Sequence, residues 1–322
     1  MPSPFRSAVT FSLLLAAFCS TSQAVHAETR ITYKSATAGT AYHEMGAELS
    51  EAIDSATSGQ IILAQEESQG SVQNVMEVMA RQGNYVFTTP SDLVEQALTA
   101  TGPFTERPHP RFQNIRGLFP LPAMTMHFIL GGDDGVVSTD ALKGKHILIG
   151  RGTFSAREAA RYFTLFGLDK QIRIADATLG SGPEALKNGQ IDGFVTASSF
   201  PTPNIFDVAA SMPISMVSLS DEQIDMIGTP RRIIPGGTYP GVNRNVQTTS
   251  LPVMAYTTTQ MDDDLAYTLT RTFWEVLPAM AAESSWWSGI TPELLGNMAG
   301  KLHAGALRYY EEVGIDIPEA LR

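Results

Sequence analysis

The sequence is almost free of cysteine. Cys19 is the only one, and it lies in an N-terminal stretch with the pattern of an export leader. In that stretch Arg6 precedes the apolar run 8–18, and small and polar residues then lead to Ala27. Cleavage near Ala27 would leave no cysteine, which excludes disulfides, thiolate catalysis and cysteine-ligated metals. Phe18, where a lipid-anchored receptor has a small residue, argues against lipid attachment at Cys19.

Long apolar runs and positive charge are also scarce. No run reaches the roughly 20 apolar residues that cross a bilayer, so we expect an exported, soluble protein located in the periplasm. Removing residues 1–27 from 322 leaves 295, enough for two domains of ordinary size. Without Arg6, 21 Lys and Arg face 33 Asp and Glu, a net charge of −12. Such a surface repels nucleic acid and anionic lipid, although a closed pocket can still carry a local positive field.

Catalytic and cofactor motifs are missing as well. The pair His43-Glu44 lacks the second histidine of a zinc helix, because Ala47 stands at that position. No phosphate-binding loop, dinucleotide fingerprint or nucleophile elbow occurs. The six histidines are scattered without ligand spacing. We therefore expect no catalytic residues, no metal, no cofactor and no enzymatic activity.

What the sequence does contain is one strand–loop–helix pattern that occurs twice. The first block predicts strands at 31–34, 61–64 and 85–88, with helices from about 41 and 71. The second predicts strands at 146–149, 172–174 and 193–196, with helices between them. Two successive βαβαβ blocks predict an α/β protein of two lobes with largely parallel sheets.

Two extended apolar stretches link these blocks. The first consists of the stretches 114–118 and 125–130, interrupted by Pro120 and Pro122, and the second runs from 246 to 256 and contains Pro252. We interpret them as the chain crossings, with residues 28–121 and 251–322 in lobe one and 122–250 in lobe two. The last third is helical, with Asp262 to Asp264 at a helix start, where the dipole favours negative charge. Trp286 and Trp287 are expected to pack within it.

The loops after the strands carry the functional signal. Free N–H groups at a helix start bind anions, and small residues let a ligand approach the backbone. Ligands of open α/β sheets bind at the carboxyl ends of strands, where these loops lie. Arginine offers a carboxylate two parallel charge-assisted hydrogen bonds. We therefore predict Arg151, in the glycine loop, as the ligand's anchor, with Lys34 or the helix N-termini alone as the alternatives. We expect Arg157, one turn into the next helix, to face solvent.

Five motifs in order resemble the TAXI family, the solute receptors of some tripartite ATP-independent periplasmic (TRAP) transporters. They are SATAGTAYHEMG (35–46), QGSVQN (69–74), STDALKGKHILIG (138–150), LKNGQIDGFVT (186–196) and IPGGTYPG (234–241). The resemblance covers essentially the whole chain after the leader. It implies a type II-like periplasmic-binding-protein fold with the ligand in the cleft between lobes. It also implies a glutamate-like or dicarboxylate-like organic acid as ligand and a TRAP membrane subunit as partner. We expect the protein itself to be a monomer.

The resemblance also implies which residues contact the ligand. These residues lie in five loops: Ala38, Gly39, Thr40 and Tyr42; Gly70, Ser71 and Asn74; Thr89 and Ser91; Gly152, Thr153, Phe154 and Ser155; and Thr196 and Ser198. The fourth loop departs from the family, since Thr153-Phe154-Ser155-Ala156 stands where many relatives have Gly-Ser-Gly-Thr. Ligand identity is therefore not transferred from the family.

Two other functions remain open. The chain is a candidate ligand-binding subunit of a membrane sensor, which its own sequence does not distinguish from a transporter receptor. A periplasmic enzyme of the dehydratase type on the same scaffold would need a facing acid and base. His43 and Asp92 are the nearest candidates for that pair, but the five loops supply no such arrangement.

Overall fold

The computed structural model describes residues 28–322 except 39, 82, 133–134 and 151. The predicted leader, Gly39 and Arg151 therefore lie outside the described residues.

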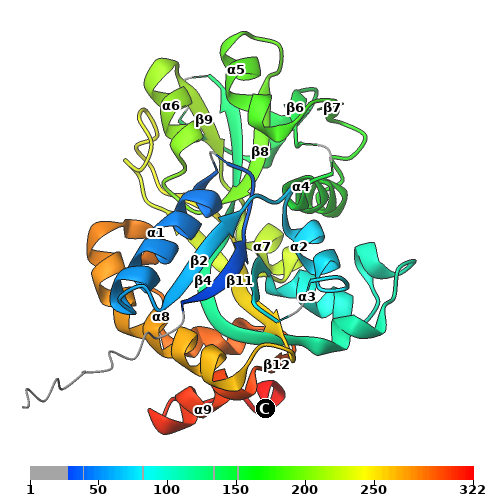
Figure 1. Cartoon of the computed structure of the whole chain (residues 1–322). Helices are drawn as coiled ribbons and strands as arrows, with labels where there is room; N and C mark the ends of the chain where they lie inside the picture. The colour runs from blue at the N-terminus through cyan, green and yellow to red at the C-terminus, as the bar shows by residue number, and fades with distance from the viewer. Residues whose placement is uncertain (1–27, 39, 82, 133–134, 151) are drawn as a thin grey trace, which may run out of the picture.

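The first βαβαβ block forms as predicted (Figure 1). Its strands are parallel, in the order β2-β1-β3. They are β1 (Thr29–Lys34), β2 (Ile61–Glu66) and β3 (Tyr85–Pro90), and the helices are α1 (Ala41–Ala56), α2 (Ser71–Glu77) and α3 (Ser91–Leu98). Thr40 caps α1 by accepting a hydrogen bond from the His43 N–H. All three helices start at the carboxyl ends of strands, so their first turns gather at one edge of the sheet.

The second block has the same organisation. Its parallel strands lie in the order β8-β6-β7. They are β6 (His146–Leu148), β7 (Arg173–Ala175) and β8 (Gly193–Ser198), with helices α4 (Phe154–Leu165), α5 (Gly182–Lys187) and α6 (Pro203–Ser211). Thr153 caps α4 by accepting from the Ala156 N–H. The periodicity of the sequence thus predicted both blocks correctly.

Two long antiparallel strands connect the blocks. Strand β4 (Ile115–Gly131) pairs with β11 (Val246–Thr258) on one side and with β8 on the other. The two extended stretches predicted between 114 and 130 are therefore one strand. Pro120 and Pro122 do not break it, because they lie beside an irregularity in the pairing with β11 at Leu251 to Val253. These crossing strands lie where the sequence predicted the connections between lobes.

The remaining elements complete both halves. They are β5 (Val136–Val137), β9 (Ile214–Val217), α7 (Asp221–Ile227), β10 (Arg231–Ile234), α8 (Asp263–Glu283), β12 (Lys301–Leu302) and α9 (Ala304–Glu312). Asp262 caps α8 through the N–H groups of Asp264 and Leu265, as its charge predicted. In the described part of the chain no helix is both long and apolar enough to span a membrane.

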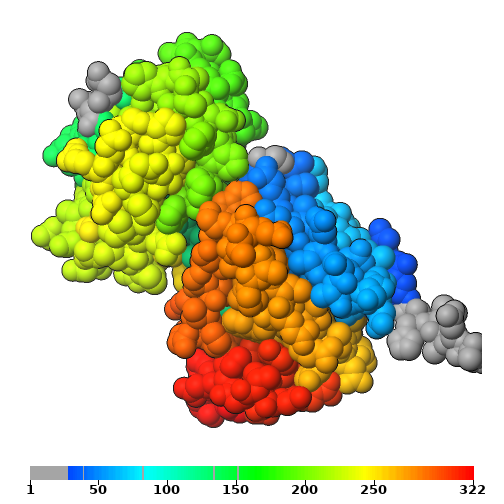
Figure 2. All heavy atoms as spheres, turned by 90° about the vertical axis from the view of Figure 1, so that its left-hand side faces the viewer, coloured from blue at the N-terminus to red at the C-terminus, as the bar shows by residue number. Residues whose placement is uncertain are grey.

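The buried apolar side chains form two clusters. The larger includes Phe119 of β4 stacked on Phe273 of α8, with ring centroids 3.9 Å apart. The smaller lies around β8 and includes Phe194, Ile205 and Met216. The larger cluster extends across both blocks, because it also contains residues of β6 and α4. Figure 2 shows two bodies, one green and yellow, the other blue, orange and red, with a notch between them.

Candidate ligand-binding site

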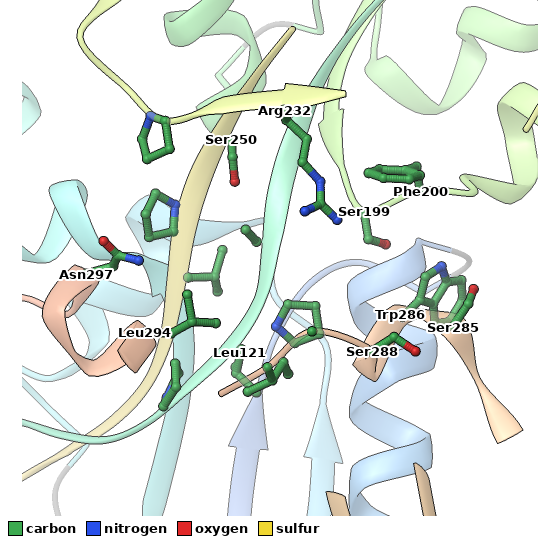
Figure 3. Close-up of a pocket in the computed structure, with 18 of the residues that line it drawn as sticks. Leu121, Ser199, Phe200, Arg232, Ser250, Ser285, Trp286, Ser288, Leu294 and Asn297 are labelled. Atoms are coloured by element: carbon green, nitrogen blue, oxygen red, sulfur yellow. The ribbon is translucent and has the colours of Figure 1, made fainter. Parts of the chain in front are cut away.

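A cavity of about 430 Å³ lies where the crossing strands pass between the two bodies. We call it the hinge cavity. Its walls come from β4 and β11, from the loop after β8, from β10, and from the segment after α8 (Figure 3). The lining residues are Pro120, Leu121, Pro122, Ala123, Ser199, Phe200, Pro201, Pro230, Arg231, Arg232, Thr238, Ser250, Pro252, Val253, Ser285, Trp286, Ser288, Gly289, Ile290, Leu294 and Asn297. Its volume is in the range of small-molecule sites.

Two adjacent arginines of β10 line the hinge cavity, and they differ in whether an acidic side chain pairs with them. The Arg231 guanidinium is 2.7 Å from an Asp221 carboxylate oxygen and 2.9 Å from Gln247 Oε1. Arg232 makes no ion pair within the described residues, and its guanidinium lies 4.9 Å from the centre of the Phe200 ring. Figure 3 shows Arg232 reaching from β10 into the cavity. The positive charge of Arg232 is therefore available to a ligand.

The loop after β8 supplies the polar and aromatic wall. Ser199 is only 4% exposed, and its Oγ has no hydrogen-bond partner among the described residues. The neighbouring Pro201 carbonyl accepts a hydrogen bond of 2.9 Å from the Trp286 indole N–H. A buried, unsatisfied hydroxyl is costly unless something pairs with it. Ser199 is thus a second group suited to a ligand oxygen.

A hydrogen-bond chain behind this loop holds it in place. The buried His127 of β4 pairs through Nδ1 with the Thr125 carbonyl oxygen at 2.9 Å and through Nε2 with the Tyr239 hydroxyl at 3.1 Å. The same hydroxyl accepts from the Thr202 N–H at 3.0 Å. Burial lowers the pKa of His127 to about 4 and raises that of Tyr239 to about 12, so both are neutral near pH 7.

The predicted loops of the first block are bound into the protein. The buried Asn74 amide donates to the carbonyl oxygens of Ser35 at 2.8 Å and Thr88 at 2.7 Å. The Thr89 hydroxyl pairs with Tyr256 Oη at 3.0 Å, and Tyr42 Oη donates to the Pro122 carbonyl. Among the remaining predicted residues here, Ala38 and Thr40 are exposed, Gly70 precedes α2 with φ +117°, and Ser71 and Ser91 are buried. Most polar atoms of this set therefore already have partners.

The predicted loops of the second block contact each other. Ser155 Oγ accepts a 3.0 Å hydrogen bond from the Ala197 N–H, which joins the first turn of α4 to β8. Thr196 and Ser198 are buried in β8, Phe154 is buried, and Gly152 is exposed. None of the fourteen predicted ligand contacts that fall within the described residues lines the hinge cavity, although Ser198 directly precedes Ser199.

Two charged residues differ from expectation. Arg157 does not simply face solvent: its Nη2 atom is buried without a partner in the described residues, and its guanidinium lies 5.6 Å from the Phe154 ring centre. Burial lowers the pKa of Arg157. Lys34, considered from the sequence as another possible anchor, is 2% exposed and pairs with Glu66 at 2.9 Å and Glu77 at 2.8 Å. Its charge is already compensated.

Sequence reasoning missed the residues of the hinge cavity for a clear reason. Arg231 and Arg232 are adjacent, and only the fold shows that one is paired with Asp221. Trp286 packs against the core as expected, but it also lines the cavity, whereas Trp287 is buried and donates to Glu48. The prolines of the crossing strands were the only available signal, since Pro120, Pro122 and Pro252 mark the place where the cavity forms.

The arrangement of two α/β bodies on crossing strands is that of periplasmic solute-binding proteins. The chain is similar to the periplasmic binding protein BugD, with a TM-score of 0.56, 8% identity, and coverage of 90% of this chain and 99% of that one. A protein of Bordetella bronchiseptica RB50 is also similar, with a TM-score of 0.50, 11% identity, and coverage of 89% and 98%. The predicted two-lobed fold is confirmed.

The family follows from the sequence itself. Residues 34–314 match the model of the NMT1-like family, so the chain belongs to that family. The match does not distinguish the TAXI receptors within it. Among the described residues, no group of three or more His, Cys, Asp or Glu is arranged to hold a metal ion.

Proposed function

We propose that this protein is an extracytoplasmic receptor that binds a small organic anion in the hinge cavity. The observation that carries the proposal is the Arg232 guanidinium, which reaches into a cavity between two lobes without an ion-pair partner in the described residues. The unpartnered Ser199 hydroxyl lies in the same wall. A guanidinium and a hydroxyl together suit a carboxylate.

The position of the cavity supports a capture mechanism. Groups from both sides of the crossing strands line it, including Arg232 on one side and Trp286 on the other. A ligand that contacts both sides binds the closed arrangement more tightly and therefore shifts the population toward it. The leader pattern and the fold agree with a receptor exported to the periplasm.

The five predicted loops remain a second candidate location for the ligand. Ser91 Oγ and Arg157 Nη2 are both buried without partners in the described residues, near the starts of α3 and α4. If the ligand binds there, Arg151→Ala should weaken binding, as predicted for a buried carboxylate anchor, and Arg232→Gln should have little effect.

Titration calorimetry with organic acids tests the proposal. The panel contains monocarboxylates together with glutamate, succinate, 2-oxoglutarate and pyroglutamate. At least one acid should bind, and Arg232→Gln should weaken it by about tenfold to a hundredfold, because the charged partner is lost. Arg173→Gln is the matched control, since Arg173 is exposed on β7, outside the cavity, and its nearest carboxylate, that of Asp192, is 4.0 Å away. If neutral solutes bind and no acid of the panel does, the proposal that this protein is an anion receptor is wrong.

We further propose a TRAP membrane subunit as the partner, on the strength of the sequence resemblance. Cells should then lose uptake of the bound acid when this gene is deleted. Uptake should stop when an ionophore collapses the ion gradient and continue when ATP alone is depleted. Unchanged uptake with a lost transcriptional response to the acid would instead favour the membrane sensor.

A further inference from the structure

The hinge cavity offers one uncompensated positive charge. Arg231 and Arg232 are the only ionisable side chains among the described residues that line it. Asp221 already pairs with Arg231 at 2.7 Å. Arg232 alone is left to balance a ligand's charge, and its guanidinium matches one carboxylate. Arg232 is exposed in this structure, and lobe closure over a ligand would remove water from it. A second carboxylate enclosed in the same space would be desolvated without a counter-charge, which is unfavourable.

The rest of the wall is poor in strong hydrogen-bond donors. Five of the lining residues are prolines, which have no N–H group: Pro120, Pro122, Pro201, Pro230 and Pro252. The Trp286 N–H is already donated to the Pro201 carbonyl, so its ring system remains for contact. Leu121, Val253, Ile290 and Leu294 add further apolar surface. The polar groups are mainly hydroxyls, which hydrogen-bond a ligand oxygen but do not balance a second full charge.

The aromatic rings lie close to the charged group. The Arg232 guanidinium lies 4.9 Å from the centre of the Phe200 ring, and Figure 3 shows Trp286 below both. A carboxylate on Arg232 would therefore have its attached body placed among Phe200, Trp286 and the prolines. Flat apolar bodies gain most from such contacts, because aromatic rings interact favourably in stacked and edge-to-face arrangements.

We infer that the cargo of the hinge cavity is a carboxylate of single negative charge with an apolar, planar body, rather than a dicarboxylate. This inference rests on the proposed receptor function and narrows it. The carboxylate pairs with Arg232 and the Ser199 hydroxyl, and the body contacts Phe200 and Trp286.

The test uses three ligands that differ by one group each. Benzoate has the inferred properties, phthalate adds a second carboxylate, and benzamide removes the charge. Calorimetry of the mature protein should show benzoate binding at least about tenfold more tightly than either of the others. Arg232→Gln should abolish the preference for benzoate over benzamide. Trp286→Ala should weaken benzoate binding while that preference remains.

The outcomes separate this inference from the proposed function. If glutamate or succinate binds and benzoate does not, the ligand class is wrong and the anion receptor stands. Phthalate binding as tightly as benzoate would also overturn the inference, because it would show a second positive site. If no acid binds, the proposed function itself fails, and this inference falls with it.

Discussion

His127 is the residue whose environment makes the sharpest prediction about stability. It is completely buried, and burial lowers its pKa from 6.5 in the unfolded chain to about 4. Below about pH 6.5 the unfolded chain binds a proton that the folded protein does not. Stability should therefore fall as the pH drops from 6.5 to 4, by roughly 3 kcal/mol from this group alone.

Urea unfolding at several pH values between 7 and 4, on the wild type and His127→Asn, isolates that contribution. The variant should be less stable at pH 7, because the hydrogen bond from the Tyr239 hydroxyl is lost or weakened. Its stability should nevertheless decline less steeply toward acid than that of the wild type. Burial also lowers the pKa of His303. This histidine is present in both proteins, so its contribution to the pH dependence cancels when the two are compared. Parallel pH profiles would contradict the account of His127.

Among the elements, strand β8 depends on a glycine at its first position. A Cβ added to Gly193 would overlap the Ile129 carbonyl oxygen of β4 and lie 2.7 Å from Leu130 Cδ2. Gly193→Ala should lower the free energy of unfolding by about 1–3 kcal/mol, because a packed strand pair cannot separate without losing contacts. Gly180→Ala is the control, since a Cβ there meets no heavy atom within 4 Å. If urea unfolding gave the same free energy of unfolding for both variants, β8 and β4 would be able to move apart at little cost, and this prediction would be wrong.

The elements also show what was predictable from the sequence. An apolar strand followed by a loop of small residues, such as β6 and the loop that ends at Thr153, is a pattern of neighbouring residues. Both blocks could therefore be located in the sequence. The hinge cavity has no such pattern, because Ser199, Arg232 and Trp286 are far apart in the chain. Only the packing of the elements brings them together, and the ion pair with Asp221 distinguishes Arg231 from Arg232.

For the whole molecule, the two crossing strands predict a hinge motion. The lobe boundaries proposed from the sequence, near residues 121 and 250, fall within β4 and β11. A ligand that joins both lobes should therefore reduce the radius of gyration, which small-angle scattering with saturating ligand measures. Arg232→Gln at the same ligand concentration should show less compaction. An unchanged radius on ligand saturation of the wild type would count against closure.

The most direct measurement is a crystal structure of the protein with the organic acid that binds best in calorimetry. We predict ligand density in the hinge cavity, with the carboxylate within hydrogen-bond distance of the Arg232 guanidinium and near Ser199 Oγ. Contacts with Phe200 and Trp286 should complete the site. Density against Ser91 and Phe154, or against Arg151, with the hinge cavity free of ligand, would contradict the central claim and return the site to the five loops.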